Sequence, residues 1–259
     1  MVPGLDAEGG MQMLNVVFWD VDGTLADTEM DGHRPAFNRA FQELGLPFHW
    51  NREEYARRLE IPGGLRRVQQ ACQEVGHPIS DELLEQLRER KRIHYGERIA
   101  AGHVGWRPGV RRLLHALKSA GIASWIVTSS GRASVNALLA ASRDEQDWFS
   151  GIVTADDVQR GKPAPDLYQL AIKRAAVEPT QALAIEDSLA GLESARAAGL
   201  ACLLTPSPWE TGLPARYGEA VAVLNHLGDP DHTSTVIAGP ACTEGVVTVK
   251  YLQALLEGG

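Results

Sequence analysis

Two aspartates directly follow a short apolar run in the stretch VFWDVDGTLADTE, residues 17–29. Burying a carboxylate costs several kcal/mol unless a cation meets it, so the pair needs either a bound partner or a surface turn. Asp20 and Asp22 are therefore the first candidates for chemistry, and a simple turn at the Asp22–Gly23 step is the alternative.

The other predicted strands also end in groups that can do chemistry. These groups are hydroxyls, an ammonium and two carboxylates: Thr128, Ser129 and Ser130, then Lys162, then Glu186 and Asp187. In an open parallel sheet, ligands collect at the carboxyl ends of the strands, near the point where the strand order reverses. We therefore expect these side chains and the two aspartates to form one site.

The residue types indicate phosphoryl transfer to a carboxylate. Oxygen ligands suit a hard cation, and Mg²⁺ commonly binds one or two carboxylates together with waters and a substrate phosphate. When a carboxylate meets a phosphate, each pair of unit charges at ~4 Å costs about 4 kcal/mol at an effective dielectric constant near 20. Mg²⁺ and Lys162 would cancel this repulsion, and Thr128 could donate a hydrogen bond to a phosphoryl oxygen.

The two aspartates then take different roles. Asp20 fits a nucleophile that forms a covalent aspartyl-phosphate. Asp22 fits the general acid and base that protonates the leaving oxygen and later deprotonates water. We expect the neighbouring carboxylates and the phosphate to raise the pKa of Asp22.

Each remaining candidate also has a structural interpretation. Glu186 and Asp187 precede Ser188 and could stabilise a helix N-terminus. Thr128 could be an ordinary β-branched strand residue, and Lys162 a solvated loop lysine. The occurrence of all these groups at strand ends favours the catalytic interpretation.

The elements that position these residues predict an α/β fold. From residue 105 onward helix-like and strand-like segments alternate, which is typical of a parallel sheet with helices on both faces. The apolar run 14–19 belongs to the same sheet, whereas residues 32–104 carry apolar residues at helical spacing only. We predict a Rossmann-like core of residues 13–31 and 105–259 with an inserted all-helical unit over 32–104.

The segments around these elements have weaker patterns. Residues 1–12 predict a disordered tail, and residues 226–247 predict a loop before a final helix at 249–258. The joints near 24–32 and 102–108 are the expected hinges of the inserted unit.

Composition excludes several classes of protein. Of 259 residues, 44% are hydrophobic and 22% are charged, and the net charge of −8 disfavours nucleic acid or an anionic membrane as the main partner. The three cysteines lie far apart, which indicates free thiols in a reducing compartment. Neither a signal peptide nor an apolar run of about 18 residues is evident. These features predict a soluble cytoplasmic protein.

The site motifs resemble those of a known family. Their order and spacing are similar to the four motifs of the haloacid dehalogenase-like (HAD) hydrolases: DVDGT at Asp20, Thr128 after an apolar strand, GKPAPD at Lys162 and IEDS at Glu186–Asp187. The inserted helical unit resembles the small C1 cap of that family.

This resemblance implies roles for individual residues. It implies that Asp20 is the nucleophile and that Asp22 is the acid and base. It also implies Mg²⁺ held by Asp20, the backbone carbonyl of Asp22 and Asp187, with assistance from Glu186.

Three further stretches are similar to the CbbY-like subgroup: residues 27–59, PGGLRRV at 62–68 and AVLNHLGDPD at 222–231. Members of that subgroup dephosphorylate sugar phosphates, and xylulose-1,5-bisphosphate is one known substrate. This chain departs from some members at Asp27, where they have Glu, at Leu65, where they have Lys, and at Gly161, where another has Lys.

The predicted substrate contacts come from the cap and from the loops that follow the strands: Asp27, His33, Gly63, Gly64, Arg67, Ser129, Ser130 and Arg132, with Arg34 and Asn38 beside His33. The backbone of the glycine pair would approach the ligand, and Arg67 and Arg132 would each bind a distal phosphate. For the helical residues, a solvated helix face is the alternative.

Together these features predict a Mg²⁺-dependent phosphatase, expected to be a monomer, that acts on a small phosphorylated metabolite. A sugar phosphomutase of the β-phosphoglucomutase type shares the fold, the metal and the aspartyl-phosphate, and differs in how long the phosphoenzyme resists water. A non-catalytic protein that binds phosphorylated metabolites is a further alternative, which the intact set of Asp20, Asp22, Lys162 and Asp187 disfavours.

Overall fold

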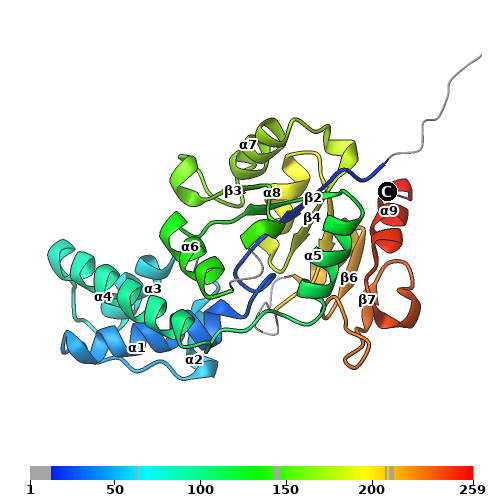
Figure 1. Ribbon diagram of the computed structural model, residues 1–259. Coiled ribbons are helices and arrows are strands. Elements are labelled where there is room, and N and C mark those ends of the chain that lie inside the picture. Colours follow the sequence, from blue (N-terminus) through cyan, green and yellow to red (C-terminus); the bar gives the residue numbers. More distant parts are fainter. Residues whose placement is uncertain (1–12, 62, 143–145, 208, 210–212, 259) are drawn as a thin grey trace, which may run out of the picture.

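The computed structural model describes residues 13–61, 63–142, 146–207, 209 and 213–258. The predicted tail at residues 1–12 lies outside the described residues. An α/β core lies beside a group of helices that is connected to it by two chain crossings (Figure 1). None of the described helices combines the length and the apolarity needed to cross a membrane.

One seven-stranded sheet forms the centre of the core, with strand order β3-β2-β1-β4-β5-β6-β7. Its strands are β1 (Val16–Trp19), β2 (Ala123–Val127), β3 (Gly151–Val153), β4 (Ala182–Glu186), β5 (Ala201–Leu204), β6 (Ala222–Leu224) and β7 (Val236–Ala238). All neighbouring strands are parallel except β6 and β7. The predicted parallel α/β core is therefore confirmed.

Strand β7 corrects one prediction, because it lies inside residues 226–247, which were expected to be loop throughout. It is three residues long, and its pairing with β6 is irregular between Val223 and Leu224. Ile237 at its centre is 48% exposed. The strand therefore lacks the pattern of buried apolar residues from which a strand is predicted.

The hydrophobic core has one layer on each face of the sheet. Along β1, Val17 and Trp19 pack on one face and Val16 and Phe18 on the other, as expected for a strand buried on both sides. Helices α5 (Val110–Ser119), α6 (Arg132–Ala141) and α9 (Val249–Glu257) cover the first face, and α7 (Asp166–Ala175) and α8 (Leu189–Ala197) cover the second.

Short helical turns connect several of these elements: η2 (Gln146–Trp148), η3 (Ala155–Asp157), η4 (Pro179–Gln181), η5 (Pro214–Glu219) and η6 (Thr243–Gly245). The cysteines are free, as their spacing predicted. Cys72 and Cys202 are buried, and Cys242 is partly exposed.

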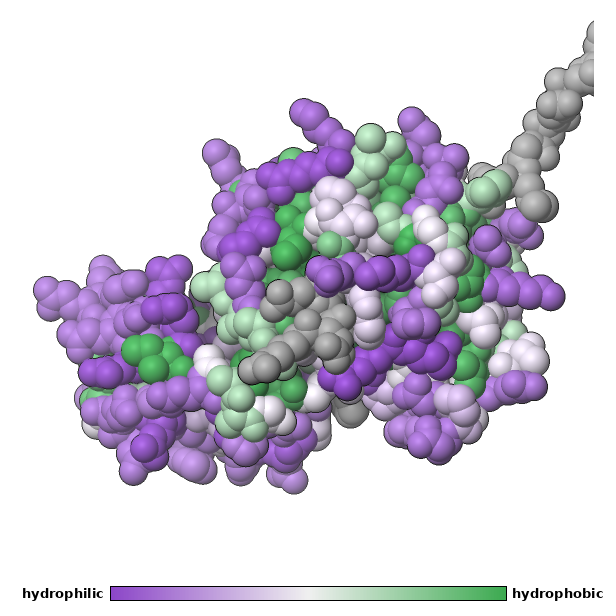
Figure 2. Space-filling model, in the orientation of Figure 1, coloured by the Kyte–Doolittle hydropathy of each residue, from purple (hydrophilic) through white to green (hydrophobic). Residues whose placement is uncertain are grey.

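The inserted unit, called the cap below, contains the π-helical turn η1 (Glu29–His33) and the helices α1 (Arg34–Glu43), α2 (Arg52–Arg58), α3 (Gly64–Glu74) and α4 (Asp81–Ala100). Asn51 and Ser80 accept hydrogen bonds from Glu54 N and Leu83 N, which satisfies free donors at the starts of α2 and α4. The cap has an aromatic-rich hydrophobic cluster of its own, whereas its outer surface is largely hydrophilic (Figure 2). The domain boundaries at 31/32 and 104/105 remain a prediction.

The fold creates one clear place for a ligand. The chain runs from β1 to β2 and β3 on one side and then crosses to β4 on the other, so the strand order reverses between β1 and β4. The two chain crossings to the cap meet nearby, where Ala26 pairs with Trp106 and Arg107 N donates to Leu25 O at 2.8 Å. The carboxyl ends of β1 and β4 thus lie beneath the cap at the switch point.

Candidate active site

Three buried carboxylates meet at the ends of β1 and β4. Because β1 and β4 are adjacent and pair Trp19 with Ile185, Asp20 lies beside Glu186 and Asp187. An oxygen from each of these residues lies within 4.8 Å of the others. The sequence prediction that these residues converge is confirmed by this geometry.

Lys162 neutralises part of this charge. Its Nζ lies 2.6 Å from Asp20 Oδ1 and 2.5 Å from Glu186 Oε1, and it donates to the carbonyl of Val127 at 2.9 Å. Tyr168, in the first turn of α7, donates its hydroxyl to the same Glu186 oxygen and places its ring 5.4 Å from the ammonium. Lys162 is therefore a buried, fully engaged cation rather than a solvated loop lysine.

Burial dominates the electrostatics of the acidic group. It raises the pKa of Asp20 to about 7, with Glu186 and Asp22 adding to the rise and Lys162 opposing it. Burial, together with Asp20 and Glu186, also raises the pKa of Asp187 well above its usual value. Burial alone would lower the pKa of Lys162, but the two carboxylates that it contacts hold it above its usual value. One ammonium does not satisfy three carboxylates, so the site favours a further cation.

The donor set fits a hard divalent ion such as Mg²⁺. Glu186 Oε2 is buried and has no hydrogen-bond partner among the described residues. Two glycines form the wall around the carboxylates: a Cβ on Gly23 would lie 2.0 Å from Asp187 Oδ2, and one on Gly191 would lie 1.9 Å from Glu186 Oε2. Carboxylate oxygens without other partners are the ligands that Mg²⁺ prefers.

Replacing Gly23 with alanine is expected to displace Asp187. Gly23 has a φ of 85° and its Cβ would meet the carboxylate, whereas Gly45 has a φ of 64° and a Cβ there would meet no atom within 4 Å. Both Gly→Ala changes strain the backbone by about 1–2 kcal/mol, but only Gly23→Ala disturbs the carboxylates. We expect Gly23→Ala to raise the Mg²⁺ concentration for half-maximal activity at least about 10-fold, and Gly45→Ala to leave it unchanged. Equal responses of the two variants would contradict this role.

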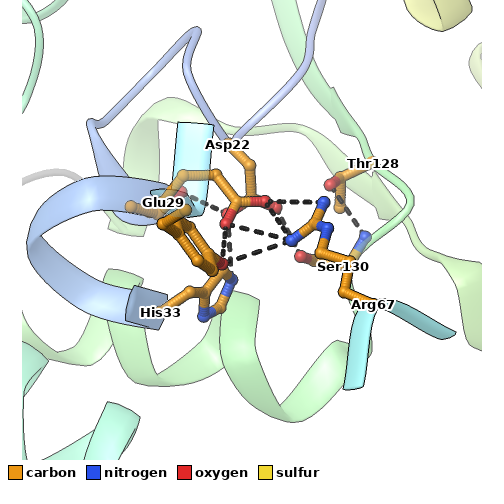
Figure 3. A network of polar contacts seen from close by, with 8 residues as sticks. Asp22, Glu29, His33, Arg67, Thr128 and Ser130 are labelled. Atoms are coloured by element: carbon orange, nitrogen blue, oxygen red, sulfur yellow. Dashed lines mark hydrogen bonds and ion pairs between the residues drawn. The ribbon is translucent and has the colours of Figure 1, made fainter. Parts of the chain in front are cut away.

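Asp22 lies on the cap side of this group and accepts several hydrogen bonds (Figure 3). Thr28 donates to Oδ1, Ser130 donates to Oδ2, and His33 Nε2 lies 3.4 Å from Oδ1. Burial raises the pKa of Asp22, but the contacts with His33, Ser130 and Thr28 outweigh it and hold the pKa well below its usual value. The expectation of a raised pKa is therefore wrong for this conformation, because donors rather than anions surround the carboxylate.

The π-helical turn η1 positions two cap-side residues. A π-helix is wider than an α-helix, so Glu29 and His33, four residues apart, lie on nearly the same side. His33 also stacks on Tyr95 of α4, with ring centres 4.2 Å apart. Asp27 accepts a hydrogen bond from the backbone of Met30, so it stabilises the start of this turn, and burial raises its pKa. The predicted substrate contact of Asp27 stays a prediction.

The residues after β2 have distinct surroundings. Thr128 is buried, and its hydroxyl accepts from Ser130 N at 3.0 Å, so it shapes the loop that presents Ser130 to Asp22. Ser129 is exposed, beside Gly161 in the Lys162 loop. These contacts are compatible with the predicted phosphate contacts of all three residues, and their roles stay predictions.

Arg67 of α3 is paired inside the cap. Its guanidinium lies 3.4 Å from Glu29 Oε1, it donates to Ile61 O at 2.9 Å and to Tyr55 OH at 3.2 Å, and Tyr55 donates to Glu29 (Figure 3). Burial raises the pKa of Tyr55 well above its usual value, with Glu29 contributing. The predicted contact of Arg67 with a second phosphate would therefore have to compete with Glu29.

The glycine pair begins α3 as predicted for a cap turn. Gly63 has a φ of 91° and provides no capping side chain, and Gly64 packs so closely that a Cβ would lie 2.8 Å from Phe37 Cζ. No side chain of the N-cap residue accepts a hydrogen bond from the backbone N–H groups at the start of α3. The predicted contact of this turn with the ligand stays a prediction.

Three residues predicted to contact the substrate have partners within the protein, and their contacts with the substrate stay predictions. Arg34 Nη1 and Asn38 Nδ2 donate to Trp50 O at 3.3 and 2.9 Å, so both residues fix a cap loop. Arg132 is turned onto Ile152 O at 3.2 Å and Asp157 Oδ2 at 2.6 Å, which ties α6 to the end of β3. Only tertiary contacts decide whether such an arginine pairs within the protein or faces a ligand, because the sequence of a helix start is the same in both cases.

Three residues that sequence reasoning missed complete the site. Glu29 balances Arg67, Tyr168 holds Glu186, and Arg107 donates to the backbone carbonyls of Gly23, Thr205 and Asn225 around the strand ends. Glu29 lies four residues before His33, a spacing that hints at a shared helix face. No sequence signal marked the other two.

Comparison with known proteins agrees with this geometry. The family model for haloacid dehalogenase-like hydrolases matches residues 14–199. The chain therefore belongs to the haloacid dehalogenase-like hydrolases.

The relatives narrow this class. Protein CbbY of Rhodobacter capsulatus is 43% identical over 201 residues, covering 77% of this chain and 88% of the relative. The CBBY-like protein of Arabidopsis thaliana is 32% identical, covering 83% of this chain and 70% of the relative. Within the family, the chain is a CbbY-like phosphatase.

Solved structures of CbbY proteins agree with this assignment to the CbbY-like phosphatases. The crystal structure of CbbY from Rhodobacter sphaeroides in complex with phosphate has a TM-score of 0.75 at 33% identity and covers 83% of this chain and 95% of that chain. A mutant of the same protein in complex with xylulose-(1,5)bisphosphate has the same TM-score and identity.

Proposed function

We propose that this protein is a Mg²⁺-dependent phosphatase that hydrolyses a small sugar phosphate, such as xylulose-1,5-bisphosphate, through an aspartyl-phosphate on Asp20. The observation that carries the proposal is the cluster of Asp20, Glu186 and Asp187 around the ammonium of Lys162. The solved complex of the R. sphaeroides relative with xylulose-(1,5)bisphosphate supports the substrate class.

In the first half-reaction a carboxylate oxygen of Asp20 attacks the phosphorus of the substrate and the ester P–O bond breaks. Asp22, which lies two residues after Asp20 in the same turn, gives a proton to the leaving sugar oxygen. Bound Mg²⁺ would supply positive charge that lets the carboxylate and the phosphate approach each other. Lys162 contributes a second positive charge from its contact with Asp20.

In the second half-reaction water attacks the phosphorus of the aspartyl-phosphate. Asp22 takes a proton from that water, phosphate leaves, and the carboxylate of Asp20 is regenerated. For the first step Asp22 must be protonated, so the donors Thr28, Ser130 and His33 must loosen when substrate binds. Movement of the cap over the site would change these contacts and exclude bulk water.

The test is a screen of phosphorylated metabolites that includes pentulose bisphosphates and hexose 1-phosphates, with free phosphate as the readout. We expect release of phosphate from a sugar phosphate in the presence of Mg²⁺ and its loss after addition of EDTA. p-Nitrophenyl phosphate with and without EDTA gives a control for chemistry independent of the sugar.

Two results would contradict the proposal. Isomerisation of a hexose 1-phosphate without release of phosphate would identify a phosphomutase. Tight binding of a sugar phosphate without any metal-dependent turnover would identify a binding protein.

A further inference from the structure

Arg107 lies where the second chain crossing returns from the cap to the core, beside the first crossing. Its backbone N donates to Leu25 O at 2.8 Å, and the preceding residue, Trp106, pairs with Ala26. The residue is only partly exposed. Arg107 therefore connects the two crossings to each other at the carboxyl ends of the strands.

The guanidinium of Arg107 lies among the loops that follow three strands of the sheet. Nη1 donates to Gly23 O and, at 2.6 Å, to Thr205 O, and Nη2 donates to Asn225 O at 2.9 Å. Gly23 lies in the turn after β1, Thr205 directly follows β5, and Asn225 directly follows β6. All three acceptors are neutral carbonyl oxygens, so one planar cation with several donors holds three loops together.

Two of these loops contact the acidic group of the site. Gly23 packs so closely on Asp187 that a Cβ would lie 2.0 Å from Oδ2. Thr205 N donates to Glu186 O at 2.7 Å. Since β4 lies between β1 and β5, Arg107 fixes the backbone on both sides of the strand that carries these carboxylates.

The charge of Arg107 has two opposing effects on the binding of a cation. Burial, Asp20 and Glu186 raise the pKa of Asp187, and Arg107 opposes this rise, which favours the ionised carboxylate that binds a metal. The same positive charge repels an incoming Mg²⁺. A strong effect of Arg107 on metal binding therefore has to come from geometry rather than from its charge.

We propose that Arg107 is a positioning residue of the metal site: by holding the carbonyls of Gly23 and Thr205, it keeps the turn after β1 against Asp187 in the arrangement that binds Mg²⁺. This inference rests on the proposed function for the identity of the metal. Arg107 acts through these two loops rather than by contact with the ion. Because its backbone also pairs with Leu25, the same residue connects the cap crossings to the metal site.

The test measures Mg²⁺ binding directly, in the absence of substrate. Each protein is freed of metal with EDTA, dialysed and titrated calorimetrically with Mg²⁺, and its Tm is recorded without metal. We expect Arg107→Met to raise the Kd for Mg²⁺ at least about 10-fold. Arg107→Lys keeps the charge but loses the fork of donors, so it should raise the Kd by a similar factor.

Arg112→Met is the matched control. The guanidinium of Arg112, on α5, also holds backbone carbonyls, but these are Gly228 O at 2.8 Å and Leu227 O at 3.2 Å instead of those of Gly23 and Thr205. Its removal should lower the Tm and leave the Kd for Mg²⁺ unchanged.

A double variant tests whether Arg107 acts through the Gly23 turn. Gly23→Ala displaces the same turn, so adding Arg107→Met to it should raise the Kd for Mg²⁺ by less than about 2-fold more. If the two effects multiply in full, Arg107 does not act through Gly23 and the inference is overturned.

Two other results would also overturn it. A lower Tm of Arg107→Met with an unchanged Kd would mean that Arg107 only stabilises the fold. A Kd of Arg107→Lys equal to that of the wild type would mean that charge alone matters, and this variant also decides the case if Arg107→Met does not fold. Phosphate release by the wild type is measured in parallel: its absence contradicts the proposed function, whereas the Mg²⁺ titrations still decide the role of Arg107.

Discussion

Asp20→Asn is expected to abolish release of phosphate, with a loss of at least about 1,000-fold in kcat, while the fold is retained. Asparagine has the shape of aspartate but cannot form the aspartyl-phosphate. It also removes a carboxylate whose pKa burial raises to about 7, so one source of repulsion in the acidic group disappears. The measurements are phosphate release under saturating substrate and the Tm of both proteins.

The control for this variant is Asp231→Asn, which makes the same chemical change at an exposed loop position. It should retain full activity. Asp20→Asn should still bind the sugar phosphate, because Lys162 and Asp187 remain in place. Substantial phosphate release by Asp20→Asn would remove the nucleophile assignment.

Lys162→Met is expected to reduce kcat at least about 100-fold and to lower the free energy of unfolding by about 3–5 kcal/mol in the absence of metal. The ammonium lies 2.6 Å from Asp20 and 2.5 Å from Glu186, both of them buried. Methionine leaves these carboxylates without their contacting cation. The loss of stability should be smaller with saturating Mg²⁺, because the ion supplies positive charge to the same oxygens.

Two further variants separate activity from stability. Lys173→Met changes an exposed lysine at the end of α7 and should leave both quantities unchanged. The double variant Lys162→Met with Glu186→Gln removes one of the unpaired charges, so it should regain stability without regaining kcat. Recovery of kcat in the double variant would show that Lys162 acts only by balancing Glu186. Chemical denaturation with and without Mg²⁺ gives the stabilities.

The buried strands of the sheet are the part of the fold that the sequence predicted well. Strands β1, β4 and β5 are almost entirely buried on both faces and read as short apolar runs, so they were recognisable from the sequence. Strand β7 was missed because it lies at the edge of the sheet, pairs over few residues and leaves Ile237 half exposed. Local patterns predict elements only where burial imposes them.

The partners of the side chains around the site could not be predicted from local sequence patterns. Arg67 and Arg132 were both predicted to bind phosphate, and these contacts stay predictions; in the structure the first pairs with Glu29 and the second with Asp157. A guanidinium on a long side chain pairs with a carboxylate as readily as with a phosphate, so its partner depends on which elements pack beside it. The raised pKa expected for Asp22 failed for the same reason, because Thr28 and His33 come from the cap-side turn.

The amino-acid sequence alone was enough to predict the catalytic chemistry proposed above: strand ends are local features, and the residues that follow them carry the carboxylates, the hydroxyl and the ammonium. The tertiary structure decided how these charges are balanced. It alone paired Lys162 with Glu186 as well as with Asp20, and Arg67 with Glu29. Charge balance depends on distances between groups that are remote along the chain, and only packing sets those distances.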